Sequence, residues 1–120
     1  MRTTITKILS FSAAHSLPQH EGKCRNVHGH TYTVEVTIEG QVKESGPSTG
    51  MVMDFADAGA DIRRLVVDPL DHSYLNDVLD FVPTAEAMAA WMFGVLASSG
   101  LPVVRVRLWE TPTSYAEVIP

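Results

Sequence analysis

The chain has 120 residues, of which 45% are hydrophobic and 19% charged, a composition typical of one globular domain spanning residues 1–120. Its formal net charge of -5 and its scattered Lys and Arg residues are unlike a nucleic-acid-binding surface, so we expect no DNA or RNA partner. No apolar run approaches the roughly 18 residues of a membrane span, and the first residues lack the apolar core of a signal peptide. Because one cysteine cannot form an intrachain disulfide and no segment directs export, we expect a cytoplasmic protein. Without a membrane-spanning run, we expect no membrane partner.

Alternating apolar residues predict strands in the first half of the chain. Residues 4–12 are rich in Thr, Ile and Phe and predict a strand that ends shortly before His15. Residues 30–39 alternate more regularly and predict a second strand. The Gly-, Ser- and Pro-containing stretch 43–50 is typical of an exposed turn, and residues 51–55 are expected to return as the partner strand of a hairpin.

Helical spacing replaces alternation after residue 54. Apolar residues recur at helical intervals over 55–67, up to the break at Asp68 and Pro69. A second helix is predicted over 85–98, with Thr84 as its N-terminal cap. Residues 103–110 and 113–119 again predict strands. This order indicates an α+β fold with a mainly antiparallel sheet.

Four of the five histidines and the lone cysteine lie between residues 15 and 30. In an extended segment the side chains of His28 and His30 point the same way, and His15 follows the first predicted strand. Three neutral imidazoles suit Zn²⁺, with a fourth position left for water or substrate. A His-x-His pair alone is often a chance feature of an exposed strand, but a third histidine and a nearby thiol favour metal binding. His20 is interpreted as solvated surface.

Cys24 admits three interpretations. It could be a fourth metal ligand that closes a structural site, or a buried small hydrophobic residue. The third interpretation is a reactive thiol, because Lys23, Arg25 and a nearby metal ion would all favour the thiolate. The polar stretch around the cysteine offers no apolar pocket, which favours the reactive thiol.

Two carboxylates are further candidates. Asp71 precedes His72 and could fix its tautomer, but neighbouring side chains diverge in regular structure, so the pair needs an irregular backbone or a partner from elsewhere. A solvated turn is the alternative. Glu110 has the same parity as Val106 and Leu108, and a carboxylate on an apolar face needs a donor, either an arginine or a ligand.

Five segments occur together between Phe11 and Thr111, namely FSAAH, Cys-x-x-x-His-Gly-His, LDHSYLND, PTAE and WET. In this order they resemble the 6-pyruvoyltetrahydropterin synthase and 6-carboxytetrahydropterin synthase family. The short interval from Cys24 to His28 resembles the bacterial 6-carboxy branch. The resemblance implies a T-fold, in which an antiparallel sheet is backed by two helices. It also implies an oligomeric barrel, expected to be a homohexamer, with active sites between subunits.

The resemblance also implies the roles of individual residues. It places zinc on His15, His28 and His30, catalysis on Cys24, Asp71 and His72, and substrate binding on Glu110, Thr84 and Glu86. Because subunits would meet at the site, Asp71 and His72 could serve Cys24 of a neighbour. Related enzymes often have serine at the position of Ala85, which puts one peripheral contact in doubt. Candidate cations for a triphosphate are Lys23 and Arg25, or Lys7, Arg105 and Arg107 at an interface.

The implied activity is zinc-dependent conversion of 7,8-dihydroneopterin triphosphate to 6-carboxy-5,6,7,8-tetrahydropterin, with release of acetaldehyde and triphosphate, in 7-deazapurine (queuosine) biosynthesis. One alternative is 6-pyruvoyltetrahydropterin synthase activity, which keeps all three side-chain carbons. A more remote alternative is a non-catalytic zinc-stabilised oligomeric module with Cys24 as the fourth ligand.

Overall fold

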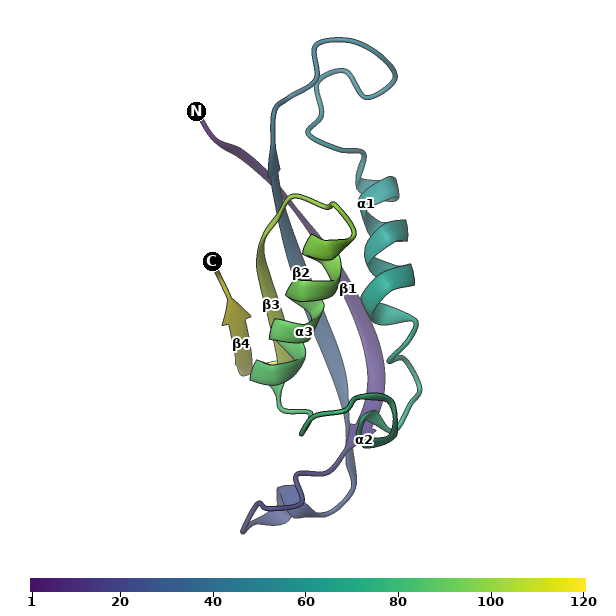
Figure 1. The fold of residues 1–120 in the computed structure, drawn as a ribbon, viewed down its shortest axis with the longest axis vertical. Coiled ribbons are helices and arrows are strands. Elements are labelled where there is room, and N and C mark those ends of the chain that lie inside the picture. Colours follow the sequence, from purple (N-terminus) through teal and green to yellow (C-terminus); the bar gives the residue numbers. More distant parts are fainter.

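The computed structural model describes residues 1–120, and it is built on one antiparallel sheet with strand order β1-β2-β3-β4 (Figure 1). The strands are β1 (Thr3–His15), β2 (His28–Gly40), β3 (Val103–Thr111) and β4 (Ser114–Val118). Strands β1 and β2 pair along their whole length, which gives the molecule its long axis of 54 Å. This pairing places the last residue of β1, His15, opposite the first residue of β2, His28, so both lie at one end of the molecule.

Two main helices cover one face of the sheet (Figure 1). Helix α1 (Phe55–Ile62) lies beside β1, and α3 (Ala85–Ser98) lies over β3 and β4. Helix α3 has the predicted bounds, and the Thr84 hydroxyl accepts the Ala87 N–H at 3.1 Å as the predicted cap. A short helix α2 (Leu75–Val78) and a 3-10 turn (Lys23–Arg25) were not anticipated from sequence. None of the helices combines the length and apolar character that crossing a membrane requires.

The first predicted helix, 55–67, is confirmed as a helical path but changes geometry part-way. Its last five residues, Arg63–Val67, form a π-helical turn in which the Asp68 N–H donates to the Arg63 carbonyl at 2.7 Å. Val66 and Val67 are both fully buried on this turn. The path then stops because Pro69 has no N–H to donate.

The predicted strand at 51–55 is wrong. Residues 51–54 form no ladder, and the Lys43 N–H donates to the Met51 carbonyl within a loop that folds back on itself. The reason lies in the sheet, because β1 and β3 already occupy both edges of β2 and leave none for a hairpin partner. Val52 instead packs at the end of the sheet, and Asp54 caps α1 through a 2.7 Å bond from the Ala56 N–H.

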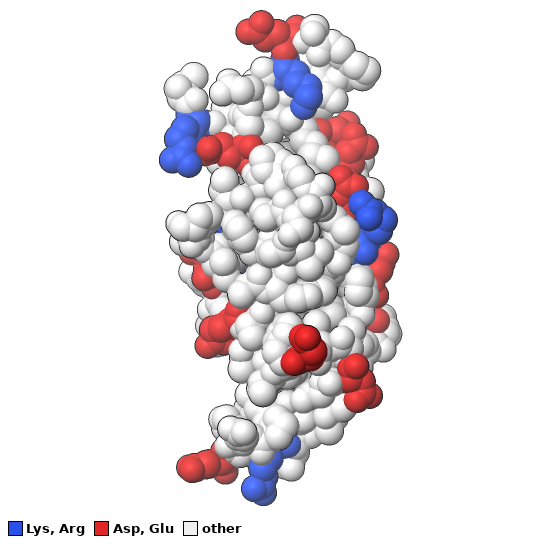
Figure 2. Space-filling model, viewed as in Figure 1, with Lys and Arg blue, Asp and Glu red and all other residues white.

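The core lies between the sheet and the two main helices. Inward-facing strand residues alternate as predicted, including Phe11, Tyr32, Val34, Val106 and Leu108. The opposite face of the sheet carries no helix and presents polar side chains. Charged groups lie mainly along the margins of the face seen in Figure 2, where the surface over α3 is largely uncharged.

Candidate active site

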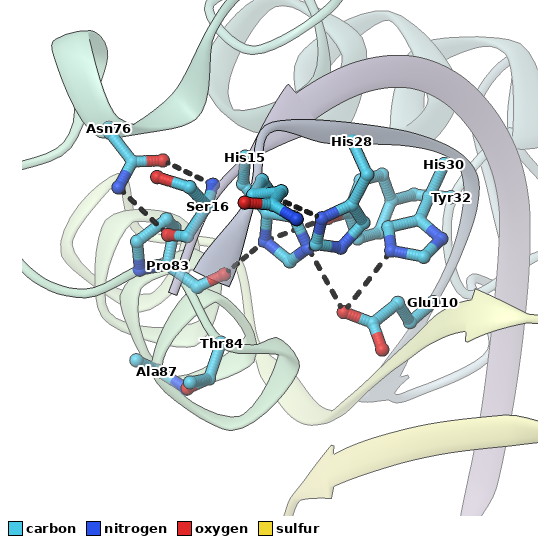
Figure 3. A network of polar contacts seen from close by, with 11 residues as sticks. His15, Ser16, His28, His30, Tyr32, Asn76, Pro83, Thr84, Ala87 and Glu110 are labelled. Atoms are coloured by element: carbon cyan, nitrogen blue, oxygen red, sulfur yellow. Dashed lines mark hydrogen bonds and ion pairs between the residues drawn. The ribbon is translucent and has the colours of Figure 1, made fainter. Parts of the chain in front are cut away.

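Three histidines converge where β1 ends and β2 begins (Figure 3). The antiparallel register sets His15 opposite His28, and His30 follows two residues later on the same side of β2. One nitrogen from each ring belongs to a set whose members all lie within 4.8 Å of one another. His15 is fully buried and the other two are half-buried. The alternation of β2 therefore continues its apolar face into a cluster of imidazoles.

Backbone carbonyls orient two of these rings. The Nδ1 of His15 lies 2.8 Å from the Pro83 carbonyl, and the Nδ1 of His28 lies 2.8 Å from the Asn26 carbonyl. A carbonyl can only accept, so each Nδ1 carries the proton and each neutral ring has an unprotonated Nε2. This outer hydrogen bond is the usual way in which a protein orients a metal-binding histidine.

The two unprotonated Nε2 atoms, of His15 and His28, lie 3.0 Å apart. A hydrogen bond between them would require a second proton on one ring, whereas a shared cation satisfies both lone pairs at once. Two nitrogens in one tetrahedral zinc shell are about 3.3 Å apart, close to the observed spacing. The three imidazoles therefore fit a divalent metal ion that accepts nitrogen ligands.

Burial keeps His30 in the form that can bind a metal. Desolvation lowers the pKa of His30, the neighbouring imidazoles His15 and His28 lower it further, and only the Glu110 carboxylate opposes these effects. A neutral imidazole is the ligand form. Tyr32 lies beneath the cluster, fully buried, and its hydroxyl is 3.4 Å from the Nδ1 of His15. Burial holds the pKa of Tyr32 well above its usual range, so its hydroxyl stays protonated.

Glu110, near the end of β3, points into the cluster (Figure 3). Its Oε1 lies 3.5 Å from the Nε2 of His15 and 3.8 Å from the Nε2 of His30. The arginine pairing that the sequence left open does not occur, because Arg105 and Arg107 both pair with Glu117. Glu110 and Glu86 line a cavity of about 380 Å³ beside β4, whereas Thr84 is engaged as the helix cap.

Asp71 and His72 contact each other within one chain. His72 has a positive φ of 60°, the irregular backbone that adjacent side chains need in order to meet, and its Nδ1 lies 2.9 Å from the Asp71 Oδ1. The Ser12 N–H also donates to this carboxylate at 3.0 Å. That bond, followed by the one from His72, lowers the pKa of Asp71. His72 lines a hollow of about 490 Å³ together with Gly29 and His30.

Cys24 lies in the 3-10 turn and is half-buried. The group of donor atoms within 4.8 Å contains only histidine nitrogens, so the structure does not bring the thiol into that group. The Cys24 carbonyl accepts the Leu17 N–H at 2.8 Å, which closes the loop 16–27 at its base. His20 is exposed, as predicted, and its Nδ1 accepts the Gly22 N–H.

Sequence reasoning missed the groups that hold the site together. The carbonyls of Pro83 and Asn26 orient histidines, but backbone acceptors leave no signal in side-chain chemistry. Tyr32, whose hydroxyl lies beside His15, gave no functional signal within the alternating segment 30–39. Asn76 contacts the backbone of Ser16 next to His15, and its polarity within LDHSYLND was the only available hint.

Residues 4–120 match the family described as 6-pyruvoyl tetrahydropterin synthase. The chain belongs to this family. A relative named 6-carboxy-5,6,7,8-tetrahydropterin synthase from Synechocystis is 49% identical, with 93% of this chain and 89% of the relative covered. One with the same name from Haemophilus influenzae is 36% identical, with 94% and 96% covered. These relatives confirm the family and its 6-carboxy branch, and membership makes the chain an enzyme of the 6-pyruvoyl tetrahydropterin synthase family.

A solved structure confirms the fold of the family. The 6-pyruvoyl tetrahydropterin synthase of Caenorhabditis elegans superposes with a TM-score of 0.85 at 31% identity, covering 100% of this chain and 96% of that chain. The predicted T-fold, with an antiparallel sheet backed by two helices, is therefore correct at the level of the single chain.

Proposed function

We propose that this chain converts 7,8-dihydroneopterin triphosphate and water to 6-carboxy-5,6,7,8-tetrahydropterin, acetaldehyde and triphosphate. The observation that carries the proposal is the trio of imidazoles, two with Nε2 lone pairs facing each other at 3.0 Å, beside the carboxylate of Glu110. The names of the relatives from Synechocystis and Haemophilus influenzae support the 6-carboxy product.

His15, His28 and His30 would hold a zinc ion in this proposal. A bound zinc ion supplies a Lewis acid that acidifies hydroxyls and polarises a carbonyl of the substrate side chain. The Pro83 and Asn26 carbonyls keep His15 and His28 in the ligand tautomer. The site does not have to reorganise these rings to accept the metal ion.

Glu110 would orient the pterin. Its carboxylate side chain is 31% exposed and borders the 380 Å³ cavity, so it can accept two N–H donors from an aminopyrimidinone edge. Two parallel charge-assisted bonds fix a planar ring more firmly than one bond does. Glu86 lines the same cavity, and we propose that it and the neighbouring Thr84 border the bound ring.

Proton transfer would fall to Cys24 and His72. The Cys24 thiolate removes a proton from the substrate side chain, and His72, held by Asp71 at 2.9 Å, passes on or donates a proton. The terminal C–O bond breaks and triphosphate leaves with the electron pair. The bond between the first and second side-chain carbons also breaks, and the second and third carbons leave as acetaldehyde. The first carbon becomes a carboxylate by gaining one oxygen from water. The net two-electron oxidation of the three side-chain carbons balances the two-electron reduction of the ring, so no external oxidant is required.

We further propose that the sites form between subunits of a homohexamer. Strands β1 and β4 end the sheet on either side, and a free strand edge readily pairs with another chain. Closure of β4 on a neighbour's β1 would generate the expected barrel. Such an arrangement would let His72 serve Cys24 of its own or of a neighbouring subunit. A cytoplasmic location would keep the lone thiol reduced, and the product would feed 7-deazapurine (queuosine) biosynthesis.

Mass spectrometry of the product tests the reaction. Zinc-loaded protein incubated with 7,8-dihydroneopterin triphosphate should release acetaldehyde and leave a carboxylated tetrahydropterin. A product that retains all three side-chain carbons would establish the 6-pyruvoyl alternative. This alternative is supported by a 37% identical relative from Poecilia reticulata, which is named 6-pyruvoyl tetrahydrobiopterin synthase. Full activity in metal-free protein would overturn the zinc proposal.

A further inference from the structure

The segment from Asp71 to Asn76 runs beside the free edge of β1 at the end that carries His15. The Ser12 N–H donates to the Asp71 carboxylate, and the His72 N–H donates to the Ser12 carbonyl at 2.6 Å. Two residues on, Ala14 forms a parallel bridge with Tyr74. The segment therefore acts as a short extra strand that also carries the Asp71 and His72 pair.

Asn76 completes this pairing with its side chain. Its Oδ1 accepts the Ser16 N–H at 2.9 Å, and its Nδ2 donates to the Ser16 carbonyl at 2.9 Å (Figure 3). The amide thus imitates a peptide group of a neighbouring strand and satisfies both backbone groups of one residue. Ser16 is 7% exposed, so water could not readily replace these bonds.

Ser16 connects the imidazole cluster to the loop that carries the Cys24 thiol. It directly follows His15, and the next residue, Leu17, donates its N–H to the Cys24 carbonyl at 2.8 Å. We propose that Asn76 is a positioning residue that fixes the base of the loop carrying Cys24 relative to Asp71 and His72. The inference rests on the proposed function, because it assigns those three residues to one reaction.

The contacts of His15 predict that the two bonds between Asn76 and Ser16 can be lost without loss of the proposed metal site. His15 pairs with His28 across the sheet and is bonded to the Pro83 carbonyl, and neither contact involves Asn76. The other backbone bonds within loop 16–27 join residues only three apart, and most of its residues are exposed. Loss of the two Asn76 bonds should therefore loosen residues 16–25, whereas Asn26, which adjoins β2 and orients His28, and the three imidazoles stay in place.

The experiment compares Asn76→Ala with Asn76→Asp, which keeps the acceptor for the Ser16 N–H but loses the donor. Asp77→Ala is the matched control, since Asp77 lies next along helix α2 and is exposed. Ser16→Ala is a second control, because it removes the hydroxyl bond to Tyr74 but keeps the backbone groups that Asn76 contacts. Each zinc-loaded oligomer is assayed for kcat, KM, zinc content and hydrogen exchange.

We expect Asn76→Ala to lower kcat by about tenfold or more, with KM within about threefold of wild type. Zinc content should stay at one ion per chain. Hydrogen exchange should accelerate by about tenfold within residues 16–25 and stay unchanged in β1. Cys24 is the only cysteine, so alkylation by iodoacetamide reports on the same loop and should become about threefold faster. Asn76→Asp should be intermediate, and both controls should resemble wild type.

Wild-type kcat and wild-type loop exchange in Asn76→Ala would overturn the inference. Uniformly faster exchange throughout β1 with parallel loss of zinc would show a merely structural role and would also overturn it. If Asn76→Ala does not fold, Asn76→Asp supplies the same comparison. A wild-type enzyme that binds zinc but lacks the proposed activity would defeat the proposed function alone, because exchange and alkylation still decide whether Asn76 fixes the Cys24 loop.

Discussion

Replacing His28 by alanine is the sharpest test of the proposed metal centre. The substitution removes one of the three nitrogens that lie within 4.8 Å and leaves the fully buried His15 in place. Apparent binding energies of about 10–16 kcal/mol for four-ligand zinc sites correspond to about 2.5–4 kcal/mol per ligand, or roughly a 70- to 800-fold loss of affinity. The chain should still fold, because His28 is half-buried at the end of β2.

The loss of affinity converts into a loss of thermal stabilisation. Zinc at about 100 times the wild-type Kd stabilises the native wild-type protein by about 2.7 kcal/mol. The same zinc concentration only equals the Kd of a variant whose affinity is about 100-fold weaker, so it stabilises that variant by about 0.4 kcal/mol. The difference of about 2.3 kcal/mol corresponds to about 9 °C for a chain of this length. His28→Ala should therefore show almost none of the zinc-dependent rise in Tm.

Thermal unfolding with and without zinc, together with metal analysis after gel filtration, measures both quantities. His20→Ala is the matched control, because His20 lies in the loop that leads to His28, is exposed, and its side chain bonds only to the Gly22 N–H. That control should bind zinc as wild type does. Equal zinc affinity in His28→Ala, or loss of zinc from His20→Ala, would refute the assignment of the three imidazoles.

Three further predictions concern the proposed chemistry. Cys24→Ala should keep one zinc ion per chain and lose about 100-fold or more in kcat, and loss of the metal would instead make the thiol a ligand. Glu110→Gln should lower kcat/KM by about 10- to 100-fold with zinc content unchanged, because one acceptor becomes a donor facing the pterin N–H groups. Asp71 has a lowered pKa in the folded chain, so its stabilising effect should be complete above about pH 4 and disappear as pH falls through that lowered pKa. The Tm difference between wild type and Asp71→Asn should shrink over that range, and a difference that grows would contradict the assignment.

Local patterns in the sequence predicted the parts of the fold that depend on local rules. Alternation through β2 places His28 and His30 on the inward side, and the cap at Thr84 gives α3 its start. The strand expected at 51–55 does not form, because both edges of β2 are already paired. Which edges of a strand are free is a property of the whole sheet and is not visible in a local pattern. The π-helical end of the first helix depends likewise on burying Val66 and Val67 together.

The candidate site shows the same division at the level of single residues. The histidine spacing was visible in the sequence, but the carbonyls of Pro83 and Asn26 that set the tautomers were not, because any residue supplies a carbonyl. The contact between Asp71 and His72 depends on a positive φ at a residue other than glycine. Such a conformation costs energy and persists only where neighbouring contacts impose it. Here the backbone of Ser12 bonds to both residues and imposes it.

The two halves of the site depend on different kinds of contact, and this has a consequence for its variants. Main-chain pairing of β1 with β2, and main-chain carbonyls, hold the three imidazoles. Few side-chain substitutions other than those of the histidines themselves should therefore disturb the proposed metal centre. The Asp71 and His72 pair and the Cys24 loop instead depend on the segment beside β1, where the side chains of Asp71 and Asn76 make decisive bonds. Variants in this segment should therefore separate turnover from metal content, whereas variants of the imidazoles should lose both together.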